Sequence, residues 1–128
     1  ILDVDCFKQI NDIYGHAVGD IVLQKFGKLL KGTFREGDIL GRIGGDEFGV
    51  IMKNIQTKDI AMKKAEELLA KTQAYKIDEL KGNNISISIG ISTAPQDGDC
   101  YMDLYKCADQ ALYQAKRSGK ARVCNYFS

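Results

Sequence analysis

Apolar residues recur along the chain with two periods, one typical of helices and one typical of strands. The strand period is clearest over residues 85–92, where isoleucine alternates with serine and glycine. One face of this strand is expected to pack in the core, while the other meets small residues or a helix. The helical period is clearest over residues 20–34, which predicts a helix with one buried stripe. That stripe comprises Val22, Leu23, Phe26, Leu29 and Leu30.

The order of the predicted elements defines a fold class. The sequence GGDE at 44–47 lies between two β-branched runs and predicts a hairpin, because tight turns need positive φ angles that glycine adopts at little cost. Strands and helices alternate irregularly around this hairpin. The sequence therefore predicts an α+β fold with a central, antiparallel-containing sheet flanked by helices. The expected helices are 7–14, 20–34, 57–75 and 101–117, and the expected strands are 1–5, 39–43, 48–52, 85–92 and 122–125.

Length and charge narrow the class of protein further. The chain has 128 residues, which suits a single domain with one hydrophobic core. Its formal net charge of +1 argues against a nucleic-acid binder or a membrane-surface binder, because both need a basic excess. Because the chain opens inside a strand, we expect it to be an N-terminally truncated fragment of a longer protein. We expect this segment to be cytoplasmic and to make no direct membrane contact.

The cysteines do not have the spacing of a metal site. Cys6, Cys100, Cys107 and Cys124 form no CxxC pair, and the only histidine, His16, lies near none of the last three in the sequence. A structural zinc site needs closer pairing of its ligands. We therefore predict free, buried thiols in a reducing compartment.

Acidic residues form two groups at predicted strand ends. Asp3 and Asp5 share one face of the first strand, and Asp46 and Glu47 lie in the Gly-Gly turn. If the two strands are neighbours, Asp3 and Asp46 converge, and their oxygens make a site suited to Mg²⁺ or Mn²⁺ with nucleotide phosphates. Gly45 would let a phosphate or base approach the backbone closely. The alternative is a polar turn and a strand end that are simply solvated.

Four motifs carry a resemblance to a known family. They are residues 3–12 (DVDCFKQIND), 15–20 (GHAVGD), 42–48 (RIGGDEF) and 108–120 (ADQALYQAKRSGK). In order and spacing they resemble the GGDEF family of diguanylate cyclases across essentially the whole chain, residues 1–128. The resemblance implies a fold like the palm of polymerases and nucleotide cyclases. It also implies condensation of two GTP into cyclic di-GMP and two pyrophosphates by a homodimer that holds one GTP per domain.

The resemblance also assigns catalytic roles to residues of this chain. Asp3, Asp46 and the backbone carbonyl of Val4 would hold two Mg²⁺ (or Mn²⁺) ions per GTP site. Asp46 would lie closest to the proton that the attacking hydroxyl loses, with Glu47 beside it. Lys8 would meet the charge that builds up on the phosphate. Two metals are suited to this reaction, because they polarise the phosphate and acidify the hydroxyl.

Substrate contacts follow from the same resemblance. Lys116 and Lys120 would hold the β- and γ-phosphates, although Lys120 stands where the family usually has arginine. Asp20 and Asn11 would recognise the N1–H and N2–H₂ edge of guanine, which adenine lacks. His16 resembles the family's substrate-adjacent histidine, and its alternative role is helix capping or packing.

A possible regulatory motif precedes the Gly-Gly turn. Arg35 and Asp38 resemble the family's RxxD inhibitory site, where the product cyclic di-GMP binds. The middle helix has Glu67, Leu68 and Leu69 where the family often carries a second arginine, so product inhibition is expected to be weak. The alternative is a cation at a helix end followed by a turn aspartate.

Two other functions remain open to the sequence. The chain could be a catalytically weak module that binds GTP or cyclic di-GMP without turnover, although intact Asp46 and Glu47 favour an enzyme. It could also use ATP, but a carboxylate at Asp20 argues against tolerance of adenine.

Overall fold

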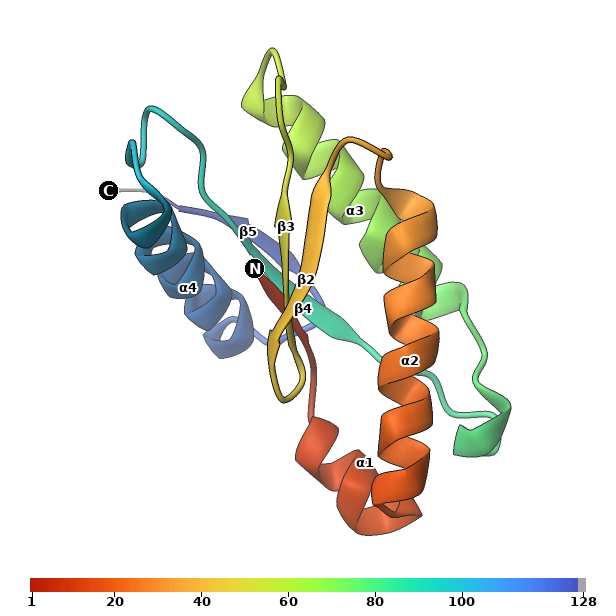
Figure 1. Cartoon of the computed structure of the whole chain (residues 1–128). Helices are drawn as coiled ribbons and strands as arrows, with labels where there is room; N and C mark the ends of the chain where they lie inside the picture. Colours follow the sequence, from red (N-terminus) through yellow and green to blue (C-terminus); the bar gives the residue numbers. More distant parts are fainter. Residues whose placement is uncertain (127–128) are drawn as a thin grey trace.

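A five-stranded sheet with helices on both faces forms the domain (Figure 1), and the computed structural model describes residues 1–126. The strand order is β2-β3-β1-β4-β5, with β4 and β5 parallel and all other neighbours antiparallel. This confirms the predicted α+β class. None of the helices within residues 1–126 has both the length and the apolar character needed to cross a membrane. In chain order the elements are β1 (Leu2–Val4), α1 (Phe7–Tyr14), α2 (His16–Thr33), β2 (Ile39–Gly44), β3 (Glu47–Ile51), α3 (Lys58–Ala74), the 3₁₀ helix η1 (Asp78–Leu80), β4 (Ile87–Ile91), α4 (Tyr101–Arg117) and β5 (Val123–Asn125).

Most element boundaries agree with the sequence prediction within one residue, and the structure differs from it more in three places. Helix α2 begins at His16 and not at Asp20; the prediction missed the first turn because His16 and Ala17 are exposed and lie outside the apolar stripe. Strand β4 is shorter than the predicted 85–92. Ile85 continues the apolar alternation and is buried in the core, but it lies before the first residue of the strand. The 3₁₀ helix η1 was not predicted because one turn is too short to show a period.

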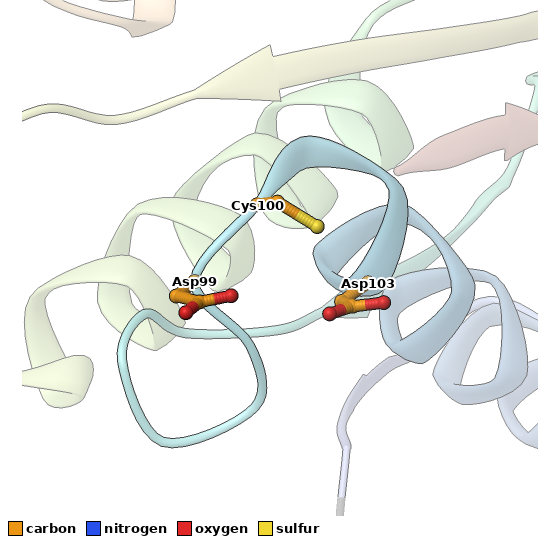
Figure 2. A group of neighbouring side chains, drawn as sticks. All are labelled: Asp99, Cys100 and Asp103. Atoms are coloured by element: carbon orange, nitrogen blue, oxygen red, sulfur yellow. The ribbon is translucent and has the colours of Figure 1, made fainter.

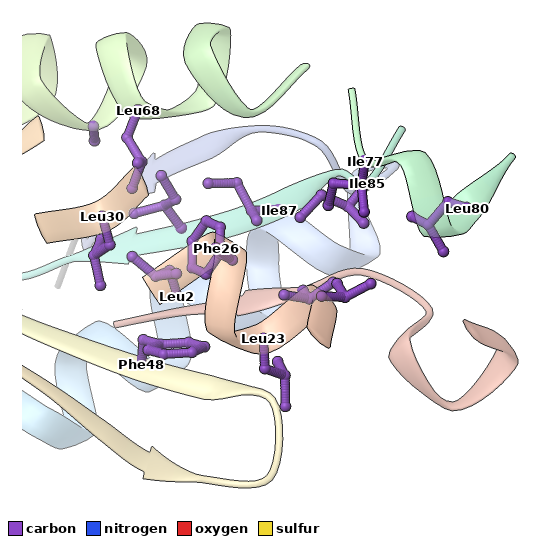
Figure 3. Packing of buried hydrophobic residues seen from close by; sticks show 14 residues of the cluster. Leu2, Leu23, Phe26, Leu30, Phe48, Leu68, Ile77, Leu80, Ile85 and Ile87 are labelled. Atoms are coloured by element: carbon purple, nitrogen blue, oxygen red, sulfur yellow. The ribbon is translucent and has the colours of Figure 1, made fainter. Parts of the chain in front are cut away.

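Helices α2 and α3 cover one face of the sheet and enclose the main core. Figure 3 shows leucine and phenylalanine side chains of these helices meeting apolar side chains of β1, β3 and β4. Phe26 of α2 meets Phe48 of β3 edge to face, with ring centroids 5.2 Å apart. Full burial of one such side chain contributes about 1.5–3 kcal/mol. The core therefore fixes β1 and β3, the strands that carry the acidic residues.

Helix α4 packs on the opposite face of the sheet, against the face of β4 that carries small residues (Figure 1). Ser88 is buried there, and Gly90 leaves no room for a side chain. A Cβ atom on Gly90 would lie 2.2 Å from the carbonyl oxygen of Ala108 and 2.3 Å from the backbone nitrogen of Leu112. The predicted second face of this strand, small residues against a helix, is confirmed.

Gly90→Ala is expected to destabilise the domain by about 3 kcal/mol, because the added methyl group meets helix backbone that no rotamer change can move. Urea unfolding measures the loss. Gly41→Ala in β2 is the matched control, since its Cβ would meet nothing within 4 Å. Equal stabilities of the two variants would contradict this account of the α4 contact.

Candidate functional site

The acidic residues of β1 and of the Gly-Gly turn lie side by side. Strands β1 and β3 are antiparallel neighbours, with Asp3 opposite Glu47. The backbone N–H of Val4 donates to the carbonyl oxygen of Asp46 at 3.3 Å, which holds the turn against β1. Gly45 has a φ of 49°, the left-handed conformation that a tight turn needs. The structure thus brings Asp3 and Asp46 together, as the sequence predicted.

Asp3 is the most constrained of these carboxylates. It is 4% exposed, and one of its oxygens, Oδ2, is ion-paired with Lys116 Nζ from α4. Its other oxygen, Oδ1, is buried and has no hydrogen-bond partner among the described residues. Burial raises the pKa of Asp3, and the negative charge of nearby Asp46 raises it further, while Lys116 opposes both effects. Oδ1 therefore has no hydrogen-bond partner of its own among the described residues, although Lys116 pairs with the other oxygen of the same carboxylate.

These residues fit a divalent cation. A buried carboxylate oxygen without a partner costs free energy unless a donor or a cation satisfies it. Asp3 and Asp46 supply the hard, anionic oxygens that Mg²⁺ prefers. Lys116 pairs with only one oxygen of Asp3 and leaves Oδ1 without a partner among the described residues. Burial lowers the pKa of the Lys116 ammonium, but the hydrogen bond and charge of Asp3 outweigh this effect and raise it.

Glu47 has a partner that the sequence did not reveal. The hydroxyl of Tyr105, in α4, donates to Glu47 Oε1 at 3.0 Å. This hydrogen bond and partial burial raise the pKa of Tyr105. The two residues are 58 positions apart in the chain, so no local pattern could have paired them. Tyr105 therefore holds the Glu47 carboxylate in place.

A cavity of about 780 Å³ opens beside these groups. Asp3, Glu47 and Lys116 line it together with residues 109–114 of α4 and Asn125 of β5. Its size is in the range of small-molecule binding sites. Lys8 and Lys120, the other two predicted phosphate ligands, do not line it: Lys8 is exposed in the first turn of α1, and Lys120 lies in the loop after α4.

Asp5 does not join the Asp3–Asp46 pair. Its buried carboxylate accepts hydrogen bonds from Ser86 Oγ at 2.7 Å, Ser88 Oγ at 2.6 Å and the Ala121 N–H at 3.1 Å. Asp5 therefore ties β1 to β4 and to the loop that carries Lys120. Asp5 follows the last residue of β1, and its negative charge raises the pKa of Asp3, but the two carboxylates have separate hydrogen-bond partners.

The thiols are free, as predicted, but none of the four is buried. Cys6 and Cys100 are exposed, and Cys107 and Cys124 are half-buried. Burial was expected because cysteine is among the most buried residue types, and that expectation was wrong. Cys6 lies in the β1–α1 connection, where Lys120 Nζ approaches its Sγ at 3.1 Å. Lys120 thus lies beside the segment that precedes Lys8.

A second group of ligand-type side chains lies at the start of α4. Figure 2 shows Asp99, Cys100 and Asp103 gathered around the first turn of this helix. All three are exposed, and none contributes to the cavity beside Asp3. Exposed acidic groups of this kind are ordinary features of helix N-termini.

The predicted guanine-binding residues meet at the corner between α1 and α2. Asn11 is half-buried in α1, and its amide oxygen rests against Gly19, the residue before Asp20. His16 and Asp20 are exposed in the first turns of α2. The corner is fixed by the hydrogen bond from the Gly15 N–H to the Asn11 carbonyl at 2.8 Å. The structure therefore brings Asn11 close to the residue that precedes Asp20.

Arg35 and Asp38 bond to each other at the end of α2. Arg35 Nη2 lies 2.9 Å from Asp38 Oδ1 and donates to the Lys53 carbonyl at 2.7 Å, while the Arg35 N–H donates to Asp38 Oδ2 at 3.0 Å. Burial opposes ionisation of Asp38, but the hydrogen bonds from Arg35 outweigh it and keep the pKa of Asp38 below its usual value. Half of the Arg35 side chain remains exposed, whereas that of Asp38 is fully covered. On the middle helix, Leu68 is buried in the core.

Arg35→Ala is expected to lower the free energy of unfolding near neutral pH, because Asp38, whose side chain is fully covered, loses its charged donors. A carboxyl group with a lowered pKa stabilises the fold above its unfolded-state pKa. That contribution disappears as the pH falls through the folded-state pKa. The gap between parent and variant should therefore narrow as the pH falls below the ordinary pKa of an aspartate. Urea unfolding across this pH range measures the difference in unfolding free energy, with Lys28→Ala as the control. A difference between parent and Arg35→Ala that stays constant with pH would contradict the prediction.

The fold and the site together define a class: an α+β domain that brings the carboxylates of Asp3 and Asp46 together with Lys116 at one edge of its sheet. A family model described as "Diguanylate cyclase, GGDEF domain" matches residues 1–122. The chain belongs to the GGDEF family, as the sequence motifs indicated.

Individual relatives agree with this assignment. The chain is 40% identical over 124 residues to Diguanylate cyclase A of Treponema denticola, covering 96% of this chain and 33% of the relative. Among solved structures, the GGDEF domain of TpbB from Pseudomonas aeruginosa superposes with a TM-score of 0.93 at 35% identity, covering 98% of this chain and 74% of that one. The GGDEF domain of DgcB from Caulobacter crescentus, solved in complex with c-di-GMP, gives a TM-score of 0.87 at 26% identity, covering 97% and 74%. The chain thus spans about a third of the curated relative's length.

Proposed function

We propose that this domain condenses two GTP molecules into cyclic di-GMP and releases two pyrophosphates. The observation that carries the proposal is the pairing of Asp3 and Asp46 beside Lys116, with Asp3 Oδ1 buried and unpartnered. Membership of the diguanylate cyclase family supports it. Because GTP is the substrate, we place the domain in the cytoplasm.

Asp3, Asp46 and the backbone carbonyl of Val4 would hold two Mg²⁺ or Mn²⁺ ions per GTP. Such ions, when bound, polarise the α-phosphate and lower the pKa of the attacking 3′-hydroxyl. Asp46 is the nearest base for the proton of that hydroxyl, and Glu47, held by Tyr105, lies next to it in the chain.

The lysines neutralise the triphosphate. Lys8 meets the charge that develops on the α-phosphate, and Lys116 and Lys120 hold the β- and γ-phosphates. Lys116 pairs with Asp3 in this structure, and its ammonium has two further N–H donors for phosphate oxygens. Lys120 acts as a point charge, without the bidentate geometry of arginine.

Asp20 and Asn11 select guanine, with His16 near the substrate at the first position of α2. Gly45 lets the nucleotide approach the turn without meeting a side chain. An acceptor that loses its donor is costly, so this arrangement discriminates against adenine.

Catalysis requires two domains that face each other, because each 3′-hydroxyl attacks the other nucleotide's phosphate. Arg35 and Asp38 are proposed to bind the product weakly and inhibit the enzyme. Arg35 can use its exposed half for this purpose, whereas Asp38 is occupied with Arg35. The DgcB GGDEF domain, which has c-di-GMP bound in its structure, is a precedent for product binding.

Incubation with GTP and Mg²⁺, followed by chromatography of the products, tests the proposal. Cyclic di-GMP and pyrophosphate are the expected products, and specific activity should rise steeply with protein concentration because two domains must meet. Fusion to a dimeric partner should raise it at low concentration. Binding of GTP or cyclic di-GMP without turnover in the fused protein would favour a binding module instead.

A further inference from the structure

We propose that Gly19 determines base specificity, because its missing side chain sets the position of the Asn11 amide. This inference rests on the proposed function. Gly19 is buried in α2, on the side that faces α1. A Cβ atom there would lie 1.9 Å from Asn11 Oδ1, 3.1 Å from Asn11 Cγ and 3.2 Å from Phe7 Cζ. The Asn11 amide therefore occupies the space that any other residue at position 19 would fill.

The groups around position 19 determine which of them moves when a methyl group is added there. The backbone at this corner is fixed, since the Gly15 N–H donates to the Asn11 carbonyl at 2.8 Å and the Gly19 N–H donates to the Gly15 carbonyl at 3.1 Å. Phe7 packs against the hydrophobic core. The Asn11 amide is the end of a flexible, half-buried side chain, so it is the group that moves. An alanine at position 19 thus displaces the amide and leaves the helices in place.

The same substitution costs little stability. Alanine favours the helical conformation over glycine, which offsets the crowding. Gly90 is the contrasting case, because its added Cβ would meet the backbone of α4. Gly19 is therefore a position where recognition can change while the fold remains.

Displacement of Asn11 has a specific consequence for the base. Asp20, the next residue, offers a carboxylate to the N1–H and N2–H₂ edge of guanine, and the Asn11 amide adds a contact with the 2-amino group. Inosine lacks that amino group and cannot make this contact. A site discriminates less between two bases when the group that contacts the atom in which they differ is moved. Gly19→Ala should therefore weaken guanosine binding more than inosine binding.

Calorimetric titration with non-hydrolysable GTP and ITP analogues, in Mg²⁺, tests the inference on the whole chain. Gly19→Ala is expected to weaken binding of the GTP analogue about tenfold and that of the ITP analogue by less than about threefold. Gly27→Ala is the matched control, because it lies in the same helix and its Cβ would meet nothing within 4 Å. It should bind both analogues as the parent does.

A double variant separates displacement of Asn11 from a general packing effect. In an Asn11→Ala background, Gly19→Ala should cause no further loss, since the displaced group is already gone. Additive losses, or an unchanged ratio of GTP to ITP affinity in Gly19→Ala, would overturn the inference. If Gly19→Ala alone does not fold, the double variant should fold and match Asn11→Ala, and a double variant that stays unfolded also overturns it. A parent that does not prefer the GTP analogue to the ATP analogue would instead refute the proposed function.

Discussion

Asp46→Asn should reduce the Mg²⁺-dependent formation of cyclic di-GMP at least about 100-fold. An amide is a poor ligand for a hard cation, and it cannot accept the proton of the attacking hydroxyl. The substitution also removes a negative charge whose field raises the pKa of Asp3. Because it relieves repulsion between two carboxylates, the fold should be at least as stable as in the parent.

The initial rate at saturating GTP, measured over a range of Mg²⁺ and Mn²⁺ concentrations, gives the loss. Thermal unfolding in the absence of metal checks that the variant is folded. Asp59→Asn, an exposed carboxylate at the start of α3, serves as the control and should keep the parental rate. A folded Asp46→Asn protein with parental turnover at saturating metal would remove Asp46 from the metal and base roles.

Asp20→Ser should raise the KM for GTP about 50-fold and narrow the preference for GTP over ATP by a similar factor. The expected loss corresponds to a charged hydrogen bond of about 2–3 kcal/mol. Asp20 is exposed in α2 and accepts no recorded hydrogen bond among the described residues, so the fold should not depend on it.

Steady-state kinetics with GTP and ATP, on the dimer fusion, supplies both values of kcat/KM. Gln24→Ser is the control, since it places the same side chain one turn further along the exposed face of α2. An Asp20→Ser variant that still discriminates between the nucleotides as the parent does would exclude Asp20 from guanine recognition.

The sequence predicted the acidic site because its geometry depends on local pattern plus one strand pairing. Alternation placed Asp3 on the face opposite Leu2 and Val4, and two glycines fixed the turn that carries Asp46. The convergence of Asp3 and Asp46 also required the two strands to be neighbours, and in the structure β1 pairs with β3. The motifs were also sufficient to identify the family.

Local pattern by itself thus determined the five strands and four α-helices, the α+β class and the position of Asp46 in the Gly-Gly turn, but not the 3₁₀ helix η1. Tertiary structure alone decided which groups touch: Lys116 on Asp3, Tyr105 on Glu47, and Asp5 on Ser86, Ser88 and Ala121. These contacts join residues 58 to 116 positions apart. Periodicity reports only which side of its own element a residue occupies. The partner on that side depends on how the helices dock on the sheet, and here a glycine in β4 lets α4 approach closely enough to reach both Asp3 and Glu47.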